Sequence, residues 1–79
     1  MGLFGKSNEE KASHLHHKGV NLIKKEKFEE ALECFNEAIS IDSTNPEFWT
    51  WKSFALKKLG RHEEAEQCVA KAKQVEERE

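Results

Sequence analysis

The sequence contains one proline, four glycines, two cysteines and no tyrosine in 79 residues. Proline and glycine break helices most strongly, so their scarcity leaves long stretches free to become helical. Val, Ile and Thr, which favour strands, are also few, whereas Glu, Lys and Ala are abundant. Two cysteines are too few for the disulfide framework of a small secreted domain. These absences predict an all-α fold, and the length allows a single domain, residues 1–79.

Two further absences narrow the class of protein. The 13 Lys and Arg residues do not outnumber the 15 Asp and Glu residues, so the basic excess typical of nucleic-acid-binding proteins is missing. No apolar run approaches the roughly 20 residues that cross a bilayer, and the start lacks the apolar region of a signal peptide. We therefore expect a cytoplasmic protein with no membrane partner.

A helix is expected to begin directly after Ser7. Ser7 and Glu10 have the capping-box form, in which the Ser oxygen accepts an N–H at the helix start and the Glu reaches back to the cap. Residues 1–7 are then expected to form a flexible lead-in that packs Leu3 and Phe4 on this helix.

Apolar residues at steps of three and four indicate four helices of about 14 residues, joined by short loops. The third begins at Asn45 and Pro46, because Asn is a good N-cap and Pro needs no N–H at the first helical position. Gly60 is expected to end that helix by adopting a left-handed conformation. The fourth helix begins near Arg61 and frays into the charged residues at the C-terminus.

The second half of the chain repeats the first at an offset of 34 residues. Small and large apolar residues match in order along both halves without a gap, which chance alone rarely produces. The matching pairs are Leu15 with Trp49, Leu22 with Leu56, Ala31 with Ala65, Cys34 with Cys68, Phe35 with Val69, and Ala38 with Ala72.

This period and these residues resemble the tetratricopeptide repeat family. The resemblance implies two tandem helix-turn-helix repeats, residues 8–43 and 44–79, with four antiparallel helices in a short right-handed superhelix. Phe28, Phe35 and Trp49 are then expected to fill the space between the two helix pairs. The residues that fit the family pattern are Gly19, Leu22, Phe28, Ala31, Phe35 and Ala38 in the first unit, and Trp49, Leu56, Gly60, Ala65, Val69 and Ala72 in the second. Departures include Leu15 in place of the family's Trp and Ser53 in place of its Gly.

The outer face of the second repeat is expected to be polar. Leu32 and Ile39 should meet the following helix pair, whereas their counterparts Glu66 and Lys73 are charged. A further repeat would have to bury both charges, which is costly. The fourth helix is therefore expected to act as an end cap, with the chain complete at two repeats and monomeric rather than homodimeric.

The resemblance implies that the first helix of each repeat lines a concave groove, which binds a peptide or helix of another protein. Trp51 and Phe54 are the predicted anchors, because exposed aromatic residues often mark binding sites. The clamp with which some family members hold chaperone tails is not expected, because His16, Val20 and Trp51 occupy its Lys and Asn positions. The predicted groove residues are His16, Val20, Ile23, Lys24, Thr50, Trp51, Phe54, Lys57 and Lys58.

Two alternative functions stay open at this point. His14 and His17 share a helix face and could bind a metal, although no Cys lies at ligand spacing from them. Trp51 and Phe54, with nearby lysines, could stack on single-stranded RNA, although the net negative charge of the chain argues against this. No phosphate loop or nucleophile motif is present, so neither a catalytic residue nor a cofactor is predicted, and both cysteines are expected in the core.

Overall fold

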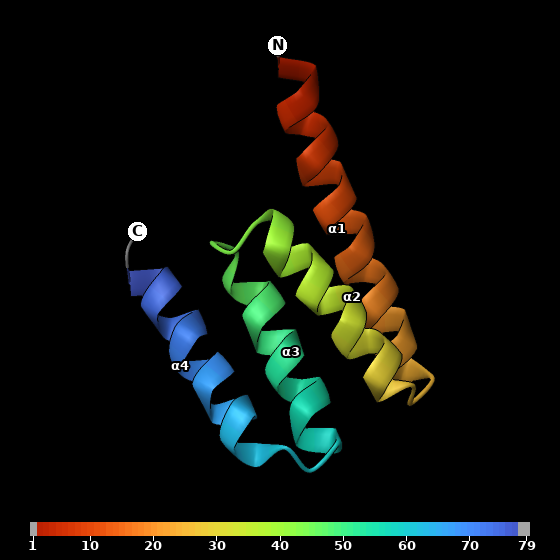
Figure 1. Cartoon of the computed structure of the whole chain (residues 1–79), viewed down its shortest axis with the longest axis vertical. Helices are drawn as coiled ribbons and strands as arrows, with labels where there is room; N and C mark the ends of the chain where they lie inside the picture. Colours follow the sequence, from red (N-terminus) through yellow and green to blue (C-terminus); the bar gives the residue numbers. More distant parts are fainter. Residues whose placement is uncertain (1, 78–79) are drawn as a thin grey trace.

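The computed structural model describes the backbone of residues 2–77 and the side chains of residues 8–77 (Figure 1). Consecutive helices run antiparallel, so α1 and α3 point in the same direction and α2 and α4 in the opposite one. Within residues 2–77 there is no strand, which confirms the all-α fold of two helix-turn-helix units. None of the described helices is long and apolar enough to cross a membrane. The helices are α1 (Gly2–Lys24), α2 (Phe28–Ile41), α3 (Pro46–Lys58) and α4 (His62–Glu77).

The first helix is longer than the sequence pattern predicts. α1 begins at Gly2 and Ser7 lies inside it, so the expected helix start after a Ser7 cap is wrong. The segment contains no proline, and once a helix has formed each added residue gains a backbone hydrogen bond, so the helix continues through the capping sequence. The first turns of α1 project beyond the end of α2 in Figure 1. The expected packing of Leu3 and Phe4 lies outside the described side chains.

Both helix pairs are closed by the same turn. In the second pair, Gly60 has φ 80° and the N–H of the next residue donates to the carbonyl of Leu56 at 2.9 Å. Thirty-four residues earlier, Glu26 has φ 62° and the next N–H donates to the carbonyl of Leu22 at 2.8 Å. A left-handed residue followed by this hydrogen bond is the Schellman motif. The left-handed conformation predicted for Gly60 is confirmed.

The start of α3 also follows the prediction. The side-chain oxygen of Asn45 accepts a hydrogen bond from the N–H of Glu47 at 2.9 Å, and Pro46 is the first helical residue. The indole N–H of Trp49 donates to the carbonyl of Ser43 at 2.9 Å, which ties the first turn of α3 to the loop before it. These contacts fix where α3 begins against the end of α2.

The centre of the core is filled by Phe35 of α2 and Leu56 of α3, the largest fully buried side chains. A Cβ added at Gly19 would lie only 2.6 Å from a ring carbon of Phe35, so α1 passes this ring at a distance that only glycine permits. Leu32 belongs to the same buried cluster, and Ile39 packs on a second one. Both therefore face the second helix pair, as expected.

The second cluster brings Phe48 of α3 against Ala12 and Ala38. Phe48 is 4 % exposed, whereas its neighbour Trp49 is only half-buried. The sequence pattern predicts Trp49 between the helix pairs and does not single out Phe48. One residue along a helix changes the direction of a side chain by about 100°, because a turn takes 3.6 residues, and this difference decides which ring enters the core.

Candidate functional site

The predicted groove residues of α1 and α3 are joined by aromatic contacts. The ring centre of His16 lies 5.2 Å from that of Phe48 and 6.4 Å from that of Trp51. Trp51 in turn lies 6.0 Å from Phe54. Tilted and edge-on arrangements at these distances are favourable for aromatic pairs. His16, Trp51 and Phe54, here called the aromatic row, therefore run from α1 across α3.

Exposure to solvent rises along the aromatic row. The His16 side chain is 12 % exposed. Trp51 is half-buried and packs against the main core, so its indole supports the fold as well as contributing surface. Phe54 is 40 % exposed and stands out among the described side chains as the exposed large hydrophobic one. Of the two predicted anchors, Phe54 is the one presented to solvent.

The remaining predicted groove residues differ in what they can offer a partner. Ile23 is 9 % exposed and belongs to the core cluster, so it presents little surface. Val20 is half-buried, and Thr50 is exposed with its hydroxyl donating to the carbonyl of Pro46 at 3.0 Å. The Nζ of Lys58 lies 5.4 Å from the ring centre of Phe54. Lys24, Lys57 and Lys58 are all exposed.

His16 is held in an apolar setting with one polar neighbour. Its Nε2 lies 4.0 Å from a carboxylate oxygen of Glu47, and its Nδ1 is buried without a hydrogen-bond partner. Burial lowers the pKa of His16, Glu47 opposes that shift, and the neighbouring His17 adds to it. The neutral imidazole is therefore favoured, which suits a ring packed against the side chains of Phe35, Phe48 and Trp51.

A hollow of about 350 Å³ opens beside His16, where α1 passes the start of α3. Three of its lining residues carry carboxylates, on α1, on the α2–α3 loop and on α3. Because these three carboxylates come from separate segments, no spacing in the sequence predicts this acidic hollow. Its lining residues are Glu9, Ala12, Ser13, His16, His17, Asp42, Asn45, Glu47 and Phe48.

Of the two histidines considered for metal binding, His17 is engaged within its own helix. The Nδ1–H of His17 donates to the carbonyl of Ser13 at 2.9 Å. Among the described residues, no group of three or more His, Cys, Asp or Glu side chains is placed to hold a metal ion. Cys34 and Cys68 are buried and unpaired, as expected, and burial raises the pKa of both thiols.

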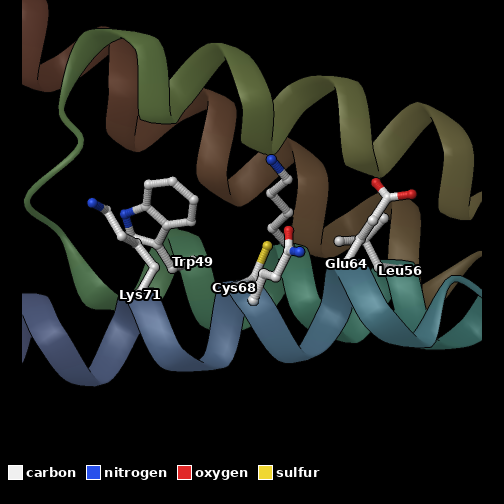
Figure 2. A pocket seen from close by; sticks show the side chains of 7 residues that line it. Trp49, Leu56, Glu64, Cys68 and Lys71 are labelled. Carbon is white, nitrogen blue, oxygen red and sulfur yellow. The ribbon is translucent and has the colours of Figure 1, made fainter.

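A second hollow, of about 260 Å³, lies along α3 and α4 and has a different lining (Figure 2). Trp49 stands at one end of it, and Leu56 and Glu64 stand at the other. The Nζ atoms of Lys52 and Lys71 lie 5.5 and 6.0 Å from the Trp49 ring, within the range of cation–π attraction. The sequence pattern gives no sign of this hollow, because it predicts Trp49 between the helix pairs.

Comparison with known proteins agrees with this architecture. A family model described as TPR repeat matches residues 19–60, and one described as tetratricopeptide repeat matches residues 46–78. An uncharacterised protein of Methanocaldococcus jannaschii is 41 % identical over 69 residues, which cover 87 % of this chain and 80 % of that protein. No solved structure matches the chain. The first family model spans more than half of the sequence, and the chain therefore belongs to the tetratricopeptide repeat family.

Proposed function

We propose that the chain is a non-catalytic module that binds a peptide or helix of a partner protein on the surface formed by α1 and α3. Tetratricopeptide repeats are in general protein-interaction modules and typically non-enzymatic scaffolds. A protein partner is favoured over a nucleic acid because the net charge is −2. The proposed surface, called the α1–α3 face, consists of the aromatic row with Val20, Thr50, Lys24, Lys57 and Lys58.

The observation that carries the proposal is the exposure of Phe54 next to a half-buried indole. A single exposed apolar side chain is ordinary on a protein surface, but Phe54 contacts Trp51, which contacts His16. The apolar surface is thus continuous across α3 and supported from α1. An aromatic anchor surrounded by partly buried neighbours is the usual form of a binding hot spot. Both a helix and an extended peptide can use such a surface.

The test selects peptides on the intact chain from a phage-displayed library and measures their dissociation constants by calorimetry. Phe54→Ala should weaken the selected peptides at least tenfold, which corresponds to about 1.4 kcal/mol and is typical of a hot-spot residue. Phe28→Ala is the matched control, because Phe28 is a half-buried ring at the start of α2, outside the α1–α3 face. It should change the constants by less than about twofold.

Circular dichroism on both variants shows whether each keeps its helices, so a loss of binding through unfolding is recognised. The proposal is wrong if no peptide is enriched on the chain. It is also wrong if Phe54→Ala binds the selected peptides as tightly as the unaltered chain.

A further inference from the structure

The basic side chains of the α1–α3 face gather at one of its ends. Lys24 lies in the last turn of α1, and Lys57 and Lys58 lie in the last turn of α3. The two helices run in the same direction (Figure 1), and the approach of His16 to Glu47 sets their register. Lys24 follows His16 by eight residues on α1, and Lys57 follows Glu47 by ten residues on α3. The three ammonium groups therefore mark the same end of the face.

The opposite end is acidic. Glu9, Asp42 and Glu47 all line the acidic hollow beside His16. His16 adds little positive charge there, because burial lowers its pKa and keeps the ring neutral near pH 7. The hollow, at about 350 Å³, is large enough to admit the end of a long side chain. Between the two charged ends lie Trp51 and Phe54, so the face is acidic, then aromatic, then basic.

Helix stability alone does not account for this order. Lysines in a last turn interact favourably with the helix dipole, and that effect acts on every helix. However, α2 and α4 have no basic residue in their last turns, whereas α1 and α3 both do. Among the described helices, lysines in the last turn thus occur only on the two that form the face.

These lysines are also available to a partner. Within residues 8–77 the one pair of charged side chains in contact is Arg61 with Glu64, since the His16 that lies 4.0 Å from Glu47 is neutral. Lys24, Lys57 and Lys58 therefore have no carboxylate partner among these residues. The nearby acids Glu26, Glu29 and Glu30 line a separate hollow with Phe28 and Leu59.

We propose that the partner segment is bipolar and binds in one direction, with its carboxylates over Lys24, Lys57 and Lys58, an apolar residue on Phe54, and a Lys or Arg in the acidic hollow. This inference rests on the proposed function and adds the charge order of the partner. From Glu47 to Lys57 the helix rises about 15 Å. The opposite charges of the partner therefore stand about ten residues apart if it is helical, or about five if it is extended. Exposed ion pairs add little affinity but discriminate well between orientations, so the charges fix the direction.

The experiment uses two synthetic helical peptides of about 14 residues, long enough to span both charged ends, with identical composition and blocked termini. One has its Glu residues at the N-terminal end, Leu and Phe in the middle and its Lys residues at the C-terminal end. The other has the same charges evenly mixed. The sorted peptide should bind at least tenfold more tightly at low salt, and the difference should shrink as salt screens the charges.

Charge reversal on the protein provides the matched variants. Lys57→Glu combined with Lys58→Glu should reduce binding of the sorted peptide to the level of the mixed one. Lys73→Glu, which reverses an exposed lysine on α4, should leave binding unchanged. A nitroxide on the Glu end of the sorted peptide should broaden the amide signals of residues 57 and 58 but not those of residues 12 and 13. A nitroxide on the Lys end should do the reverse.

The outcomes separate this inference from the proposed function. The charge order is overturned if the two peptides bind with equal affinity, or if either label broadens signals at both ends of the face. Selected peptides that lose affinity on Phe54→Ala would still support the α1–α3 face. Failure of the sorted peptide to bind while selected peptides do bind also overturns the charge order alone. If neither the synthetic nor the selected peptides bind, both proposals fall.

Discussion

The two helix pairs share one backbone plan but pack it with different side chains. In the first pair the fully buried ring of Phe35 lies against Gly19, where no Cβ fits. At the same positions the second pair has Val69 and Ser53. Ser53 is buried, and its hydroxyl donates to the carbonyl of Thr50 at 2.6 Å. A large side chain on one helix requires glycine on the other, whereas a smaller one leaves room for serine, so volume is conserved across each pair.

The second helices of the two pairs, α2 and α4, differ in polarity at matching positions of the repeat. Leu32 and Ile39 of α2 pack on the clusters shared with α3, whereas Glu66 and Lys73, their counterparts on α4, are exposed. The same position in the repeat is therefore apolar where another helix pair covers it and charged where the described chain leaves it open. The repeat backbone fixes where this side chain lies, and the presence or absence of a neighbouring helix pair determines whether it is apolar or charged.

The largest expected effect comes from giving the first pair the small residue of the second. Gly19→Ser should lower the free energy of unfolding by about 1–3 kcal/mol, because the new Cβ would overlap the buried Phe35 ring and force it to move. Urea denaturation followed by circular dichroism measures this loss.

A second substitution should rescue part of this loss and gives the more specific test. Gly19→Ser combined with Phe35→Val recreates the side-chain pair of the second unit and removes the overlap. It should therefore be less destabilised than the sum of the two single changes, by at least about 1 kcal/mol. Strictly additive losses would show that the ring and the glycine are not coupled. Ser53→Gly is the control in the second pair, where a smaller residue meets no such ring.

The 34-residue repeat is also the reason why much of the fold could be predicted from sequence. The offset of 34 residues aligns Gly60 with Glu26, and both have left-handed backbones in the structure. Local rules of this kind depend on neighbouring residues alone. The start of α1 was missed because Ser7 fits a cap as well as a helix interior, and residues 2–6 before it contain no proline to end the helix.

The candidate site was only partly predictable for a different reason. The exposed Phe54 and the lysines at the helix ends follow from helical periodicity. The acidic hollow joins Glu9, Asp42 and Glu47, which are adjacent only after α1 has packed on α3. The choice of Phe48 over Trp49 as the buried ring depends on the same packing angle, which periodicity does not specify.

A smaller effect is expected at the two turns. Gly60→Ala should lower the free energy of unfolding by about 1 kcal/mol, because a left-handed backbone is unfavourable for a residue with a Cβ. Apart from the adjoining residues, no atom lies within 4 Å of the added Cβ, so the loss comes from backbone strain and not from a steric clash. Glu26→Gly should raise the free energy of unfolding by somewhat less than about 1 kcal/mol, since the relief of strain is partly offset by a more flexible unfolded chain.

Urea unfolding of both variants, with Glu26→Ala as the control for loss of the carboxylate, measures these opposite changes. Glu26→Ala keeps the strained backbone and should stay close to the unaltered chain. Equal behaviour of Glu26→Ala and Glu26→Gly would show that charge rather than conformation matters at this turn.

The smallest expected effect concerns acid stability and again separates the two pairs. His16 has Thr50 as its counterpart, so only the first pair titrates at this position. Burial lowers the folded pKa of His16 below its ordinary value of 6.5. The unfolded chain therefore binds this proton more readily, and the stabilisation is complete above about pH 6.5 and is lost as the pH falls below it. His16→Thr should reduce the fall in the urea midpoint between neutral and mildly acidic solution, whereas His62→Gln, at an exposed site, should not. A His16 ring that titrates in NMR spectra at or above the ordinary value would contradict the burial argument, because desolvation can only favour the neutral form.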